Sequence, residues 1–437
     1  MTTLRRPSSL LALVLATATF AGGARAQETR LVALGADAKS KPKDAAASLA
    51  YGRALRRAAH WAEAKSELLR AVALATGAAK VDARWELARV ELDQGLSNPS
   101  LPAPVQLPAC KAIVIGKDGG ALSHVCAAEA WLAFGRASIA GDELDKASQA
   151  DPKLYELELG RAKLAAYDDK HADAIARLDA LSKANGARAD AFLWLGRELL
   201  ATAKRADAVT PLKKARELDT DWPEAAYELS RALPDGTEAR DAARLAVAMR
   251  PAWVDAQARL GELELQTGGL DAARAAFDAA IKLNGKHAGA RTGLAWVLVK
   301  QKKFADAKAA ALEAEKLAGN SPSARLAHAE AQAGLGEVDD AVETFKFAAG
   351  LDAKDPTGLV RAAEVLLAAK QPMKAEAHAE AAVKAFPGDG RAWRVKGDAS
   401  LANGDKGSAR DAYKKALAAP DGGIDKAALQ KKLDALK

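Results

Sequence analysis

Small residues recur at a fixed spacing along this chain, and the spacing predicts pairs of packed helices. In the C-terminal part, a small residue returns every 34 positions, at Gly261, Ala295, Ala329, Ala363 and Gly397. Twelve positions after each comes an alanine, at Ala273, Ala307, Ala341, Ala375 and Ala409. Four positions later come Phe277, Ala311, Phe345, Ala379 and Tyr413. Small residues on facing helices allow close approach, and the larger residues fill the remaining gaps. The pattern predicts a repeated helical hairpin.

This repeat resembles the tetratricopeptide repeat family, whose 34-residue signature is W-x₂-L-G-x₂-Y…A-x₃-F…A…P. The last unit matches the signature at Trp393, Gly397, Ala409, Tyr413 and Ala416, and it departs from it at Lys396 and Ser400. Further matches upstream are Gly52 with Ala64 and Leu68, Leu159-Gly160 with Ala172, and Gly196 with Ala208 and Leu212. Between Ser230 and Gly261 the period shortens to 31. The resemblance implies an all-α, right-handed superhelical solenoid over residues 45–437, because each hairpin buries its apolar face only on its neighbours.

The same reading divides the chain into six parts. They are a signal peptide (1–26), a polar N-terminal tail (27–44), N-terminal repeats (45–95), a Pro/Gly-rich insertion (96–125), the main repeat array (126–423) and a C-terminal capping helix (424–437). The capping helix is expected because Leu429, Leu433 and Leu436 alternate with lysines and can cover the apolar face of the last repeat.

The first residues have the pattern of an export signal. Arg5 and Arg6 precede an apolar stretch over residues 10–21, and Ala24-Arg25-Ala26 supplies small residues for cleavage before Gln27. The alternative is a membrane anchor that is never cleaved. No later stretch is long and apolar enough for a membrane span. We therefore expect a periplasmic or secreted protein.

The insertion cannot be helical throughout, because it contains Pro99, Pro102, Pro104 and Pro108 followed by several glycines. Cys110 and Cys126 bracket its second half, with a short β-branched segment at 111–115 between them. In an oxidising compartment we expect a disulfide between the two cysteines, and a loop of this size would add about 3 kcal/mol of stability. Two free thiols are the alternative. The insertion either belongs to a binding surface or is a tolerated loop.

Composition supports helix and argues against several functions. The chain contains 110 alanines, only 5% aromatic residues and a net charge of +7, which is too small for a nucleic-acid-binding protein of this length. The six histidines form no close pair, and the two cysteines lack metal-ligand spacing, so we expect no metal site and no cofactor. A G-x-S-x-G or phosphate-binding glycine motif is also missing, so we predict that the protein is not an enzyme.

One row of residues is the candidate site. In the family, the residue after the mid-helix small residue faces the concave groove, and six arginines are assigned to it: Arg53, Arg89, Arg136, Arg161, Arg197 and Arg231. The row continues with Glu262, Trp296, Glu330, Glu364 and Asp398. Guanidinium groups suit carboxylates and phosphates, so the arginines could bind an acidic segment. Alternatively, each arginine pairs with a nearby acid and is structural.

The expected function is a non-catalytic periplasmic scaffold that binds an envelope protein in its groove and supports assembly of a complex. Binding of an anionic glycan or lipid headgroup is one alternative. An accessory subunit of an envelope enzyme or transport machine, acting through residues 96–125, is another. The family's carboxylate-clamp members use Lys and Asn on this helix, and that pairing is missing here.

Overall fold

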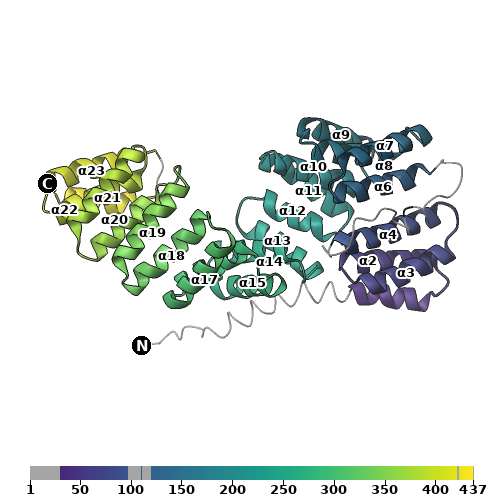
Figure 1. The fold of residues 1–437 in the computed structure, drawn as a ribbon, viewed down its shortest axis with the longest axis horizontal. Coiled ribbons are helices and arrows are strands. Elements are labelled where there is room, and N and C mark those ends of the chain that lie inside the picture. The colour runs from purple at the N-terminus through teal and green to yellow at the C-terminus, as the bar shows by residue number, and fades with distance from the viewer. Residues whose placement is uncertain (1–29, 97–109, 111–119, 421–422, 437) are drawn as a thin grey trace, which may run out of the picture. The chain divides into compact units, whose positions relative to one another are not determined.

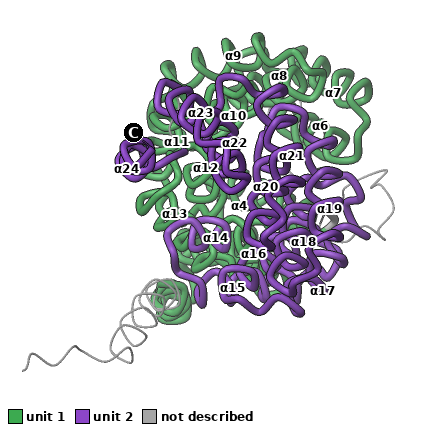
Figure 2. The backbone as a smooth tube through the Cα atoms, turned by 90° about the vertical axis from the view of Figure 1, so that its left-hand side faces the viewer, with its two compact units in different colours: residues 1–259 green, residues 260–437 purple. Residues whose placement is uncertain are grey.

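The computed structural model describes residues 30–96, 110, 120–420 and 423–436, which form helices joined by short turns (Figure 1). The signal peptide and the segment 111–115 lie outside these residues. Contacts divide the chain into two compact units, residues 1–259 and 260–437 (Figure 2). No helix in the described part of the chain is long and apolar enough to cross a membrane.

The N-terminal unit is a series of antiparallel helix pairs, in which each first helix packs on its second helix and on the next pair. Its helices are α2 (Ala45–Arg57), α3 (Trp61–Leu74), α4 (Gly77–Leu96), α6 (Ala121–Ala133), α7 (Ala137–Ala150), α8 (Tyr155–Tyr167), α9 (His171–Ala184), α10 (Ala189–Ala201), α11 (Arg205–Leu218), α12 (Pro223–Ala232) and α13 (Thr237–Met249).

The C-terminal unit repeats the same arrangement, and α14 (Val254–Gln266) spans the division between the units. The other helices are α15 (Leu270–Leu283), α16 (Ala288–Lys300), α17 (Phe304–Leu317), α18 (Pro322–Leu335), α19 (Val338–Leu351), α20 (Thr357–Ala368), α21 (Pro372–Ala385), α22 (Gly390–Ala402), α23 (Lys406–Ala418) and α24 (Lys426–Asp434). The prediction of an all-α solenoid of helical hairpins is confirmed within each unit.

The predicted small-to-large contact holds each hairpin together. A Cβ atom added to Gly196 would lie 2.3 Å from Cγ of Leu212, and one added to Gly397 would lie 2.4 Å from the Tyr413 ring. Leu212 and Tyr413 are fully buried. At these two positions a methyl group would overlap the facing side chain where it now lies, so glycine permits the close contact.

Most hairpin turns share a left-handed residue at the same place in the repeat, and the turn between α12 and α13 is an exception. Glycine occupies it at 135, 268, 336 and 404, but Asp169, Ala203, Lys302 and Lys370 also have φ near +59°. The turn geometry is thus fixed by the helix pair rather than by the residue type.

Three boundaries differ from the sequence expectations. Residues 30–40, expected as a polar tail, are helical, and Leu31 and Ala38 pack against the first hairpin, because two apolar residues seven apart lie on one helix face. α6 begins at Ala121, inside the expected insertion, after Gly120 in a left-handed conformation. At the other end, α24 begins at Lys426, and Leu429 and Leu436 are buried beside Tyr413.

Candidate functional site: an arginine-lined cavity

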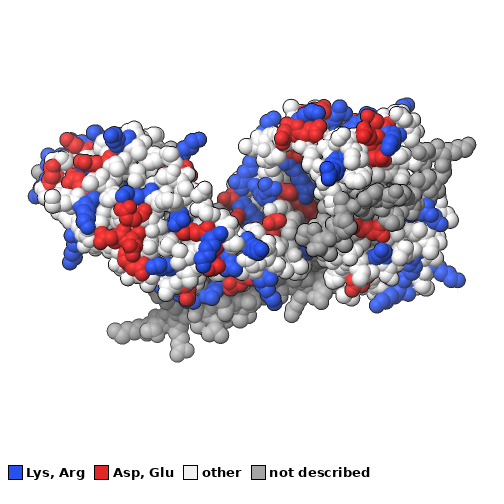
Figure 3. Space-filling view, viewed as in Figure 1, with Lys and Arg blue, Asp and Glu red and all other residues white. Residues whose placement is uncertain are grey.

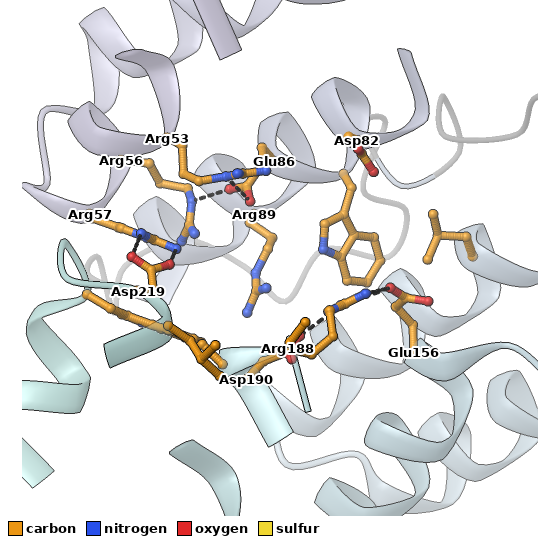
Figure 4. A pocket seen from close by; sticks show the side chains of 16 residues that line it. Arg53, Arg56, Arg57, Asp82, Glu86, Arg89, Glu156, Arg188, Asp190 and Asp219 are labelled. Atoms are coloured by element: carbon orange, nitrogen blue, oxygen red, sulfur yellow. Dashed lines mark hydrogen bonds and ion pairs between the residues drawn. The ribbon is translucent and has the colours of Figure 1, made fainter. Parts of the chain in front are cut away.

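The N-terminal unit encloses a cavity of about 350 Å³ that is lined mainly by first helices of the hairpins (Figure 4). α2 supplies Arg53, Arg56 and Arg57, and α4 supplies Asp82, Trp85, Glu86 and Arg89. Across from them lie Leu122 of α6, Glu156 of α8, Arg188 and Asp190 at the start of α10, and Leu218, Asp219 and Trp222 between α11 and α12. The first helices of this unit therefore face the hollow, as the family resemblance implied.

Two arginines of α2 converge on one buried carboxylate. Nε of Arg53 donates to Glu86 at 2.9 Å, and Nε of Arg56 donates to the other oxygen at 2.9 Å. Arg56 also reaches Asp93 at 2.7 Å. Burial alone would raise the pKa of Glu86, but Arg56 and Arg53 outweigh it and hold that pKa well below its ordinary value. Glu86 is thus ionised at neutral pH and fixes both arginines.

Arg188 is held in the same way on the opposite wall. Its guanidinium donates to Glu156 at 3.1 Å and to Asp190 at 2.9 Å, and it lies 4.0 Å from the centre of the Tyr155 ring. The Tyr155 hydroxyl donates to Asp190 at 2.6 Å. Burial and the Asp190 carboxylate raise the pKa of Tyr155 far above its ordinary value, so the phenol keeps its proton.

The two ends of the unit meet beside the cavity. Arg57 at the end of α2 donates to Asp219 at the end of α11 at 2.6 Å, and its guanidinium lies 5.2 Å from the centre of the Trp222 ring. Nε of Arg250 donates to the carbonyl oxygen of Arg57 at 2.9 Å, and Arg30 lies 2.8 Å from Asp221. These contacts tie the first hairpin to the α11–α13 region, so the helices around the cavity close on themselves.

Arg89 differs from the other four arginines of the cavity. It makes no hydrogen bond or ion pair with any residue that the structure describes, and its nearest aromatic neighbour is Trp85, with the guanidinium 5.9 Å from the ring centre. Figure 4 shows its side chain extending from α4 into the cavity, toward the space between Asp219 and Arg188. No carboxylate of the described residues thus contacts this guanidinium, although its charge helps to lower the pKa of Glu86 and Glu129.

The structure brings four of the six predicted arginines into one row. Arg53 and Arg89 line the cavity, whereas Arg197 and Arg231 share the buried carboxylate of Glu228, at 3.0 and 2.8 Å. The interpretation that these arginines pair with nearby acids therefore holds for three of them.

Arg136 and Arg161 do not belong to the row. Arg136 precedes α7 in the turn after Gly135, and Arg161 bonds to Glu158 one turn away on its own helix. Their hairpins are shifted relative to the predicted alignment, because the buried small residues are Ala128 and Ala162, each sixteen positions before a buried leucine at 144 or 178. The residues that follow them in the row are Glu129 and Lys163.

In the C-terminal unit three acidic members of the row, Glu330, Glu364 and Asp398, have basic partners. Arg361 donates to Glu330 at 2.6 Å and also contacts Glu364, which Arg394 contacts in turn. Arg394 donates to Asp398 at 3.0 Å, and Lys432 donates to Asp398 at 2.6 Å. Trp296 lies on α16, and its indole N–H donates to Ser323 at 3.0 Å. We call the series Glu330, Arg361, Glu364, Arg394 and Asp398 the charge ladder. The row thus changes from arginines to acids as its sequence indicates, but these three carboxylates are paired with cations and do not form an exposed acidic surface.

Sequence reasoning missed Trp85, Trp222, Arg57 and Arg188 as cavity residues. Trp85 and Arg89 are four positions apart, so a helical reading of α4 would place them on one face. Arg57 and Asp219 offer no such signal, since 162 positions separate them. Among the described residues, no group of three or more His, Cys, Asp or Glu side chains could hold a metal ion.

Comparison with known proteins agrees with the repeat pattern. A tetratricopeptide repeat family model matches residues 258–322, 292–356 and 360–424. No curated protein sequence matches the chain. Among solved structures, the APC/C hetero-tetramer Cut9–Hcn1 is similar, with a TM-score of 0.52, 14% identity, and coverage of 85% of this chain and 81% of that chain. Yeast Tom70 has a TM-score of 0.44 and 16% identity, and the match covers 91% of this chain and 96% of that chain.

The fold likeness rests on the first of these structures. The family match falls on α14–α23, and the likeness to Cut9–Hcn1 extends over most of the chain. The chain therefore carries tetratricopeptide repeats in its C-terminal unit, and the whole has the fold of a tetratricopeptide-repeat protein, which is typical of protein–protein interaction scaffolds.

Proposed function

We propose that this protein is a non-catalytic scaffold, exported to the periplasm, that binds an acidic segment of an envelope protein and supports assembly of an envelope complex. The binding surface is the arginine row of the N-terminal unit, at Arg53, Arg89, Arg197 and Arg231. The tetratricopeptide repeats support a protein partner, and the export pattern before Gln27 supports the location.

The number of arginines around each buried carboxylate of the row is the observation that carries the proposal. Glu86 is shared by Arg53 and Arg56, and Glu228 is shared by Arg197 and Arg231. Each group has two guanidinium groups around one carboxylate, although Asp93 also serves Arg56. The side chains of Arg53 and Arg231 stay 38% and 47% exposed, so each has N–H groups left for a ligand. A charge-assisted hydrogen bond to such a group contributes about 1.5–3 kcal/mol.

The C-terminal unit offers no comparable excess of positive charge along its row. In the charge ladder and its end at Lys432, three acids alternate with three cations. On the face of the molecule that Figure 3 shows, basic and acidic side chains are interspersed over each unit. We therefore place acidic-segment binding on the N-terminal unit.

Site-specific photo-crosslinking in cells of the source organism tests the proposal. A photoreactive amino acid replaces Arg231 in the row or, as a control in the same unit, the exposed Ile139 on the second helix α7. We expect a discrete protein adduct from position 231 and none from position 139. Equal adducts from both positions, or none from position 231, would contradict the proposal.

A pair of charge variants tests the arginine row with the cross-linked partner in purified form. Arg53→Gln with Arg231→Gln should weaken binding by at least about tenfold, or 1.4 kcal/mol, and flatten its salt dependence. Arg136→Gln with Arg161→Gln removes the same charge outside the row and should leave affinity unchanged. Fractionation of cells, with N-terminal sequencing for a chain that starts at Gln27, tests the periplasmic location separately.

A further inference from the structure

We propose that the cavity of the N-terminal unit is a binding site for a small organic anion with a flat apolar body. Arg89 pairs with the anionic group, and the indole of Trp85 packs against the flat body. This inference goes beyond the scaffold function and does not depend on it, because it concerns a small molecule rather than a protein partner.

The state of Arg89 supports an anionic ligand. Its guanidinium projects into the cavity, is half-buried, and has no hydrogen bond or ion pair within the described chain (Figure 4). A partly desolvated cation without a partner is unfavourable, and a ligand anion would remove that cost. Glu86 is engaged by two arginines, and Glu156 and Asp190 by Arg188, whereas Asp82 at the edge of the lining is exposed.

Trp85 provides a fixed apolar wall next to this cation. Its ring packs against the buried residues of α6 and against the paired Cys110 and Cys126, which hold it from behind. Leu122, Leu218 and Trp222 add apolar surface to the lining. The rest of the lining is charged, with five arginines and five acids, so the apolar wall is the part of the cavity that could hold the body of a ligand. An aromatic or other planar ligand suits an indole face best.

The size of the cavity suits a small molecule. The volume of about 350 Å³ lies at the lower end of the roughly 300–1,000 Å³ found for ligand sites. The Arg57–Asp219 contact lies beside the cavity and ties its two sides together.

Calorimetric titration of the full mature chain tests the site with three probes of one shape. 2-Naphthoate and 2-naphthyl phosphate carry the anion, and 2-naphthamide is neutral. We expect one-to-one binding of at least one anion and at least about tenfold weaker binding of the amide. The tighter of the two anions identifies a carboxylate or a phosphate ligand.

Three variants distinguish a specific role of Arg89 from a general effect of the positive charge of the protein. Arg89→Gln should weaken anion binding at least about tenfold, Arg89→Lys should restore part of it, and Arg161→Gln, which removes a cation outside the cavity, should leave it unchanged. Thermal unfolding of Arg89→Gln should differ little from that of the parent chain, because Arg89 contacts no carboxylate of the described residues and acts on Glu86 and Glu129 only at longer range. Equal binding of amide and anions, unchanged binding by Arg89→Gln, or no saturable binding up to about 5 mM would overturn the proposal.

Discussion

Lys163 on α8 donates to Glu129 on α6, one repeat earlier, and both side chains are almost completely removed from solvent, at 8% and 10% exposure. The ammonium group also lies 4.9 Å from the centre of the Trp194 ring on α10. This pair occupies the place in the row where arginines were expected, and it joins three consecutive first helices. Its charges are therefore structural.

Replacing only one partner of this pair should be strongly destabilising. Lys163→Met leaves the buried Glu129 without its contacting cation, which should cost about 3–5 kcal/mol. The double change Lys163→Met with Glu129→Leu should recover most of that loss, because no buried charge remains. Hydrogen exchange of peptides covering α6 and α8 measures the local opening free energy. Equal protection in the single and double variants would show that the pair is not coupled.

Acid should weaken the α2–α4 contact through Glu86. The pKa of Glu86 is lowered in the folded chain, so its contribution is complete above the ordinary carboxyl pKa of about 4.3 and is lost as the pH falls toward the folded value. Protection of α2 and α4 from hydrogen exchange should therefore fall from pH 6 to about pH 3. In Glu86→Gln that dependence should be smaller and the protection at neutral pH lower. An identical pH profile in both proteins would refute this role.

Glycine should stabilise the turns whose left-handed residue has a side chain. Ala203 and Lys302 have φ of 59° and 58° and are exposed. Ala203→Gly and Lys302→Gly should each add about 0.5–1 kcal/mol, because relief of about 1–2 kcal/mol of backbone strain exceeds the entropic cost of glycine. Gly404→Ala is the reverse control: φ is 89° and no atom lies near the added methyl group, so only strain is introduced. Calorimetric melting should show opposite shifts.

A disulfide between Cys110 and Cys126 should be found in protein isolated without reductant. The structure pairs the two cysteines with Cα atoms 5.5 Å apart, and both are buried behind Trp85. Non-reducing peptide mapping should recover a linked peptide, and reduction should lower the melting temperature because about 3 kcal/mol of chain-entropy stabilisation is lost. Recovery of both thiols in free form from protein isolated without reductant would contradict the pairing.

The hairpin contacts could be predicted from sequence because they are local and repeated. Gly196 with Leu212 and Gly397 with Tyr413 are sixteen positions apart, and the structure packs each pair. The repeat positions were wrongly assigned between residues 126 and 170. Gly135-Arg136 and Gly160-Arg161 have the small residue followed by arginine that the row predicts, but they lie elsewhere in their hairpins. In an alanine-rich helix a small residue carries little information, and the buried leucines at 144 and 178 were the better guide.

The cavity could not be predicted, because its shape depends on the sum of the small rotations between successive repeats. Arg53 and Glu86 lie on adjacent first helices, 33 positions apart, within reach of a repeat-based argument. The Arg57–Asp219 contact instead requires the curvature of the whole N-terminal unit. The unpaired state of Arg89 follows only from the positions of all acids around it.

The charge ladder has a consequence for how the C-terminal hairpins find their correct neighbours. The apolar faces of α18–α23 are built largely from alanine, so hydrophobic burial discriminates poorly between one hairpin and another. Arg394 contacts Glu364 of α20 across the repeat interface, whereas the residue at that place on α16 is Trp296. A stack of α22 directly on α16 would therefore leave this guanidinium against an indole. The polar row thus penalises the misassembly to which repeat proteins are prone.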